Sequence, residues 1–275
     1  MKLAERISTL RRANGLSARQ LASLVAVAPT TVTRIEAGST SPSFDLAQEI
    51  LTVLGEPIGF TGLADRDAIA AARLALDPAL DIAVTDGVQA WRERWARIGL
   101  VDGVGGLVAG RRARLLFRAS TAARLSRRAG TADFLPTASA SAIADGLRAA
   151  GVEYALTGDT GANLYSASAG EVWPVLYVAD VAAASEAVGL TPRAEGTYGA
   201  RITLIPFDGL CELERVEIGG MTVAALDQVV LDCYGGTGRM AEQADILMGL
   251  RQSGLGLGVE PARKHAILVK VVDGT

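Results

Sequence analysis

The residues of this chain that could carry out catalytic or metal chemistry are few. His265 is its one histidine, and Cys211 and Cys233 are its two cysteines. A serine-hydrolase triad would have to be built around His265, and no Gly-x-Ser-x-Gly elbow accompanies it. One histidine and two cysteines cannot form an ordinary four-ligand zinc site without carboxylates. We therefore expect neither a bound metal nor another cofactor.

Paired carboxylates are the remaining source of enzyme chemistry, because nucleotidyl transfer needs them on a strand to hold Mg²⁺. Two aspartates in the segment 65–67 have the spacing but are expected to open a helix, whose positive end favours acidic residues. Glu212 and Glu214 are expected on one solvated side of a strand. The glycine-rich stretch 235–239 lacks the lysine of a phosphate-binding loop. The stretch 254–258 is not placed between a strand and a helix, as a dinucleotide-binding motif would be. The sequence predicts that the protein is not an enzyme. The alternative is an enzyme whose N-terminal part targets it to DNA.

Nucleic-acid binding is the chemistry that the charge pattern favours. The net charge is −3, but basic and acidic residues number 8 and 9 in residues 1–85, 10 and 3 in 86–132, and 9 and 18 in 133–275. A polyanion stabilises crowded arginines, which release its counterions on binding. Two alternatives to DNA contact stay open: the arginines could pair with acidic residues of the C-terminal half, or they could form a solvated face. The seven arginines in question are Arg111, Arg112, Arg114, Arg118, Arg124, Arg127 and Arg128.

Residues 1–58 are predicted to form short helices with tight turns. Apolar residues recur at helical spacing up to a glycine stop, and Ser17 with Gln20 three residues later makes a capping box. Pro29 suits the first position of the next helix. A small helical bundle used for dimerisation is the alternative to a DNA-binding unit.

The segment LRRANGLSARQLASLVAVAPTTVTRIEAGSTSPSFDLAQEILTVLG resembles the helix-turn-helix of the XRE/Cro/C1-repressor family. The Leu21-Ala22 pair, Glu36 with Gly38, and Pro42 carry the resemblance. It implies that the second helix of the motif enters the major groove of duplex DNA. The implied contacts are Thr30, Thr31, Thr33 and Arg34 in the groove, and Ser17, Arg19 and Gln20 near the phosphates.

Residues 64–130 are predicted to form a basic, winged-helix-like domain. Helices are expected at 65–76 and 84–98, followed by a strand at 100–101, a glycine-rich hairpin at 103–110 and a returning strand at 113–117. This order resembles the wing of MarR-like regulators. The implied DNA contacts are Gln89, Arg92, Arg111, Arg112 and Arg114.

Residues 136–275 are predicted to form a mixed α/β domain, because strands alternate with helices. Strands are expected in VEYALTG, WPVLYVA, 201–206 and 211–218. Helices are expected at 142–150, from 161, and at 181–188, with a mainly helical end from Thr222.

This domain resembles the C-terminal domain of AbiEi-type antitoxins, from type IV (abortive-infection) toxin–antitoxin systems. GVEYALTGDTGANLY, VWPVLYVAD, ITLIPFD and VAALDQVVLDCYGGTGRMAEQADIL carry the resemblance, the last best. Its motif residues are Gln228, Asp232, Gly238 and Arg239. The resemblance implies a repressor of its own operon that counteracts a nucleotidyltransferase-like toxin encoded nearby.

The sequence as a whole predicts a multidomain α+β protein: an all-α helix-turn-helix, a winged-helix-like middle and a mixed α/β antitoxin domain. The expected partners are double-stranded operator DNA and the toxin, with a homodimer possible and no membrane. Two cysteines and the lack of a long apolar run favour the cytoplasm. A ligand-responsive XRE-family regulator, whose C-terminal domain binds a small molecule, is the alternative.

Overall fold

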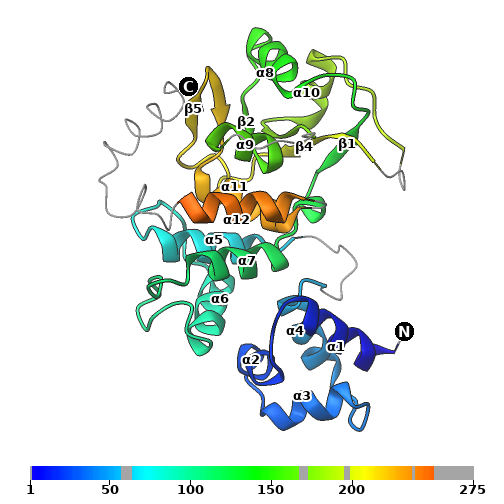
Figure 1. Cartoon of the computed structure of the whole chain (residues 1–275), viewed down its shortest axis with the longest axis vertical. Helices are drawn as coiled ribbons and strands as arrows, with labels where there is room; N and C mark the ends of the chain where they lie inside the picture. Colours follow the sequence, from blue (N-terminus) through cyan, green and yellow to red (C-terminus); the bar gives the residue numbers. More distant parts are fainter. Residues whose placement is uncertain (1, 57–63, 167–172, 195–198, 237–238, 251–275) are drawn as a thin grey trace. The chain divides into compact units, whose positions relative to one another are not determined.

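The structure is a computed structural model that describes residues 2–56, 64–166, 173–194, 199–236 and 239–250 (Figure 1). Its internal contacts divide the chain into two compact units, Met1–Arg127 and Arg128–Thr275. Residues 64–127 therefore belong to the same unit as the N-terminal helices.

Four helices form the first part of the N-terminal unit, all in segments predicted to be helical: α1 (Leu3–Ala13), α2 (Ala18–Leu24), α3 (Pro29–Glu36) and α4 (Phe44–Val53). The predicted capping box at Ser17 starts α2, and Pro29 opens α3. Helices this short are stable only when they pack together. The large side chains that they bury completely are Ile7, Leu21, Leu24, Ile35, Ile50 and Leu54.

Further along the described part of this unit lie α5 (Arg66–Leu76), α6 (Asp86–Arg97), α7 (Arg112–Ala122) and a short 3-10 helix, Leu125–Arg127. The first two confirm predicted helices, whereas α7 corrects the predicted returning strand at 113–117. Leu115, Leu116 and Ala119 are buried, and this spacing makes a helical stripe rather than the alternation of a half-buried strand. Val101 and Leu107 form only an isolated bridge. The described part of this segment is thus helical, without the strand pair of a wing.

Three arginines join the later helices to the first four. Each guanidinium donates to a backbone carbonyl oxygen at or just beyond the C-terminal end of α1, α2 or α4. These carbonyls lack intrahelical partners and carry the negative end of the helix dipole, so a cation is favourable there. The pairs are Arg118 with Asn14, Arg97 with Leu24, and Arg127 with Gly55, at 2.6, 3.0 and 2.7 Å.

A six-stranded mixed sheet forms the centre of the second unit, in the order β1-β4-β3-β2-β6-β5. β3 pairs with β4 and β2 with β6 in parallel, and the other three pairs are antiparallel. The predicted mixed α/β character is confirmed, and the sheet also contains β1 and β6, which the sequence analysis does not predict. The strands are β1 (Ala132–Phe134), β2 (Tyr154–Leu156), β3 (Val175–Val178), β4 (Ile202–Pro206), β5 (Val216–Ile218) and β6 (Met221–Val223).

The helices in the described residues of this unit are α8 (Ala140–Ala149), α9 (Gly158–Tyr165), α10 (Val181–Ala187), α11 (Leu226–Gly235) and α12 (Met240–Leu250). α9, α11 and α12 pack together, and α8 packs with α10. Figure 1 shows α8 and α10 apart from α11 and α12, with strands of the sheet between them. No helix in the described part of the chain combines the length and the apolar character that crossing a bilayer requires.

The strand predicted at 211–218 is wrong for its first half, because only 216–218 form β5. The backbone N–H groups of Leu210 and Cys211 donate to Asp208 Oδ1, at 2.9 and 3.1 Å, which turns the chain. Glu214 has a φ of 58°, outside the range of a strand.

Candidate nucleic-acid interface

The first part of the candidate interface is the start of α2. Ser17 Oγ accepts the N–H of Gln20 at 3.1 Å, and Gln20 Oε1 accepts the N–H of Ser17 at 2.9 Å. This reciprocal capping box fixes the beginning of the helix. Arg19, one residue into the helix, is exposed. Of the three predicted phosphate contacts, Arg19 therefore extends into solvent, while Ser17 and Gln20 also hold the helix start.

A tight turn then orients α3. Ala26 takes a φ of 51°, and the Val27 N–H donates back to the carbonyl oxygen of Ala22 at 2.9 Å. A left-handed residue with such a backward bond is a common way to end a helix. The turn leaves only a few residues between α2 and the start of α3 at Pro29.

The third part is the exposed face of α3. Val32 and Ile35 are buried on one side of the helix. The opposite side presents hydroxyls and a guanidinium, which can bond base edges in a major groove wide enough for one helix. All four predicted groove contacts lie outside the core: Thr30, Thr33 and Arg34 are exposed and Thr31 is half-buried.

An ion pair fixes this helix to α1. Arg11 Nε and Nη2 donate to the two carboxylate oxygens of Glu36, at 2.6 and 2.8 Å, and Nη1 donates to the carbonyl of Leu16 at 2.7 Å. The hydrogen bond to Glu36 raises the pKa of Arg11 above its ordinary value. One guanidinium thus connects α1, the residue before the α2 cap and the end of α3. The sequence analysis did not identify this pair, because it joins residues far apart in the chain.

Several exposed arginines of the N-terminal unit form no ion pair in the described residues. Among the described residues of the N-terminal unit, three arginines pair with glutamates: Arg6 with Glu56, Arg11 with Glu36 and Arg94 with Glu49. Such pairing neutralises charge within the protein. Exposed arginines for which neither an ion pair nor a side-chain bond to a backbone carbonyl is seen in the described residues include Arg12, Arg19, Arg34, Arg111 and Arg114, whereas the exposed Arg97 bonds the carbonyls of Ser23 and Leu24.

The DNA contacts predicted in residues 64–130 differ in where the structure places them. Gln89 bonds Glu93 at 3.1 Å, and Arg92 donates to the carbonyl of Val104 at 2.7 Å, so both have partners inside the unit. The prediction for the seven arginines is corrected in part: Arg118, Arg127 and Arg128 bond protein groups, as buried or half-buried guanidiniums require. For Arg128, which pairs with Asp232, the alternative of pairing with the acidic C-terminal half holds. Arg111, Arg112 and Arg114 lie at the start of α7 and not on a wing.

Comparison with known proteins agrees with the geometry of α1 to α4. A protein-family model described as helix-turn-helix matches residues 7–60. The N-terminal segment is a helix-turn-helix domain. The match supports a DNA-binding transcription regulator. No curated protein and no solved structure matches the chain.

Two residues of the predicted C-terminal motif meet in a buried polar cluster. The Asp232 carboxylate is fully buried and accepts hydrogen bonds from Arg128, Thr157, Tyr177 and Gln228. Burial raises the pKa of Asp232, while the charge of Arg128 and the hydrogen bonds oppose that rise. Gln228 and Asp232 therefore join α11 to β3 and to the start of α9. The helical spacing of Gln228 and Asp232 was a signal for a shared face, but nothing in the sequence indicated the other three partners.

The other predicted motif residues lie elsewhere. Arg239 is exposed and pairs with Glu242 at 2.9 Å. Gly238 and the earlier candidate His265 lie outside the described residues.

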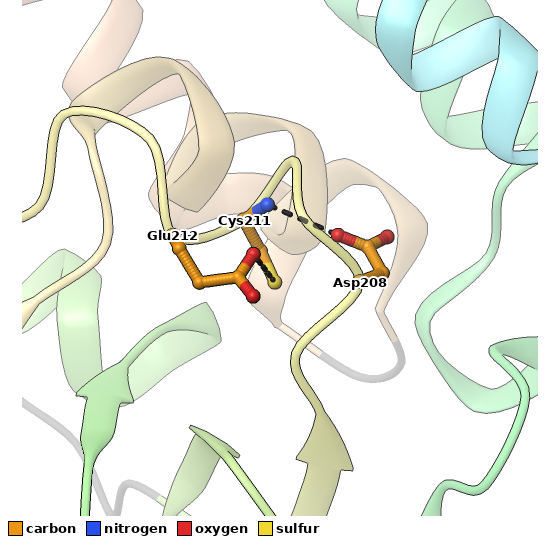
Figure 2. Close-up of side chains that lie close together, drawn as sticks. All are labelled: Asp208, Cys211 and Glu212. Carbon is orange, nitrogen blue, oxygen red and sulfur yellow. Dashed lines mark hydrogen bonds between the residues drawn. The ribbon is translucent and has the colours of Figure 1, made fainter.

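Figure 2 shows a second group with chemical potential, Asp208, Cys211 and Glu212. One donor atom of each lies within 4.8 Å of the others, close enough to share a metal ion. Burial raises the pKa of the Cys211 thiol, and the charge of Asp208 adds to this effect. Burial would also raise the pKa of Asp208, but the N–H groups of Leu210 and Cys211 and the charge of Arg128 bring it below its ordinary value. Asp208 accepts the backbone bonds that form the turn and lies within the influence of the Arg128 charge. The turn therefore accounts for the proximity of Asp208, Cys211 and Glu212 without a metal ion.

Proposed function

We propose that this protein is a repressor that binds operator DNA through α3, controls its own operon and acts as the antitoxin to a nucleotidyltransferase-like toxin. The observation that supports DNA binding is the exposed face of α3, held by the Arg11–Glu36 pair and matched to the helix-turn-helix family. The proposed activity is binding rather than catalysis.

The antitoxin role is supported by the resemblance of the C-terminal domain to AbiEi-type antitoxins. The stretch that carries it best spans α11 and α12. The acidic residues of this half, 18 against 9 basic ones, would complement a partner whose own ligand is a nucleotide or RNA. A homodimer would suit an operator with two-fold symmetry.

The DNA-binding part is tested with the double variant Thr31→Ala, Arg34→Ala and footprinting on the promoter of the protein's own gene. Loss of one good base contact weakens specific binding by about 1–3 kcal/mol. The control is the same double variant on a duplex of random sequence, where the loss of affinity should be smaller because base contacts contribute little to non-specific binding. An unchanged footprint and affinity would remove α3 from operator recognition.

The antitoxin part is tested by expressing the neighbouring reading frame alone and together with this full-length chain. The proposal expects growth arrest that the chain relieves, whether or not the two proteins co-purify. A neighbouring product that is harmless, or whose toxicity the chain leaves unchanged, would contradict the antitoxin role and leave DNA binding intact.

A further inference from the structure

A chain of contacts leads from the helix-turn-helix domain to α7. The turn between α1 and α2 begins at Asn14, three residues before the Ser17 cap. Arg118 of α7 reaches this turn, where its Nη2 donates to the Asn14 carbonyl at 2.6 Å. Thr121, further along α7, donates to Asn14 Oδ1 at 3.2 Å. These buried bonds fix α7 against the turn that precedes α2.

Arg114 lies one helical turn before Arg118, on the same face of α7. Arg118 is buried, whereas Arg114 is exposed and has no acidic partner in the described residues. Burial lowers the pKa of Arg118 to about 10, and the positive charge of Arg114 contributes to this. The exposed Arg12 precedes Asn14 by two residues, in the last turn of α1. Near the turn between α1 and α2 there are thus two exposed cations that form no ion pair in the described residues, Arg12 on α1 and Arg114 one helical turn before Arg118.

The start of α7 is unusual for a helix. Arg111 is the N-cap residue, Arg112 and Arg114 follow in the first turn, and no acidic residue lies in that turn. The positive end of the helix dipole disfavours cations at these positions. Helix stability therefore gives no reason for the exposed Arg111 and Arg114, and positions that break a local rule in this way are a feature of functional surfaces.

We propose that the DNA-binding surface continues from the helix-turn-helix onto α7, where Arg114, with Arg12, contacts the phosphate backbone beside the turn at residues 14–17. This inference rests on the proposed binding of duplex DNA by α3. It makes α7 part of the DNA-binding unit, in place of the wing that the sequence predicted. The buried Arg118 is then a positioning residue, which sets α7 and hence Arg114 against that turn.

The test measures the affinity of the full chain for a labelled duplex of mixed sequence, about three helical turns or 30 base pairs long, at stepped salt concentrations. In Arg114→Gln, loss of one phosphate contact should make the slope of log K against log salt shallower by about 0.9. Arg114→Lys, which keeps the charge, should retain most of the slope. Thermal unfolding should not fall in either variant, since the side chain is exposed and the helix dipole does not favour a cation at this position.

Arg66→Gln is the matched control. Arg66 is also exposed, but it begins α5, where the N–H of the preceding Asp65 bonds the carbonyl of Ala122 at the opposite end of α7. The slope of log K against log salt for Arg66→Gln should equal that of the unmodified protein. Equal slopes for Arg114→Gln and the unmodified protein, or equal flattening by Arg66→Gln, would overturn the inference. If the unmodified protein fails to bind any duplex, the proposed function itself fails.

Discussion

Gly55 lies against Thr121 so closely that a Cβ atom at Gly55 would stand 2.2 Å from the Thr121 carbonyl oxygen. Gly55 follows the end of α4, and Thr121 lies in the last turn of α7. Gly55 also has a φ of 81°, which disfavours any other residue. This contact is one of the points where the helix-turn-helix domain packs against the later helices.

Gly55→Ala should therefore destabilise the N-terminal unit by about 2–4 kcal/mol, from backbone strain and the clash together. Gly38→Ala is the control, because Gly38 has a φ of 70° but open space around it. It should cost only about 1–2 kcal/mol. Chemical unfolding of both variants measures the difference, and equal losses would show that α7 moves away from Gly55 without cost.

The pair Arg11–Glu36 should contribute to stability and to DNA affinity. Both side chains are only 13% exposed, so Glu36→Ala should cost about 1–2 kcal/mol of unfolding free energy and weaken operator binding by releasing α3 from α1. Glu242→Ala breaks the exposed pair with Arg239 and should cost below about 0.5 kcal/mol. A double-mutant cycle of Arg11 and Glu36 isolates the coupling, and a cycle that closes to zero would contradict it.

Asp232 should be essential to the C-terminal unit. Asp232→Ala leaves the Arg128 charge buried without its counter-ion and should cost about 3–5 kcal/mol. Gln228→Ala, which removes one neutral donor, should cost about 1–2 kcal/mol. Limited proteolysis should cut the C-terminal unit of Asp232→Ala while α1 to α4 stay protected. Equal loss of both units would instead indicate that they unfold as one.

Stability should depend on pH through Asp159. Burial raises the pKa of Asp159 to about 6, against the opposing charge of Arg239. The folded state therefore holds this proton more tightly than the unfolded state, so the contribution to stability is full below about pH 4 and is lost as pH rises through 6. Water screening reduces the loss to on the order of 1 kcal/mol. Asp159→Asn should unfold at a higher temperature than the unmodified protein at pH 8, and a lower one would contradict this.

The helix-turn-helix was readable from the sequence because its signals are local. The capping box at Ser17, the proline at 29 and the buried positions of α3 each lie within a few residues of the structure that they determine. The same holds for β3 and β4, whose buried runs are continuous. Local backbone geometry and one-sided burial depend on neighbouring residues, and the sequence displays those directly.

The helix at 112–122, in place of the predicted wing strand, and the partners of the arginines depend on contacts between residues far apart in the sequence. The place of residues 113–117 after a glycine-rich hairpin predicts a strand, but α7 forms because its buried stripe packs on α5 and α4. Arg118 and Arg114 look alike in the sequence, yet only Arg118 meets the carbonyl of Asn14. The sequence by itself determined the DNA-binding motif and the mixed α/β character of the second half. Only the tertiary structure decided which charges are satisfied inside the protein and which face solvent, since a charge's partner can lie a hundred residues away.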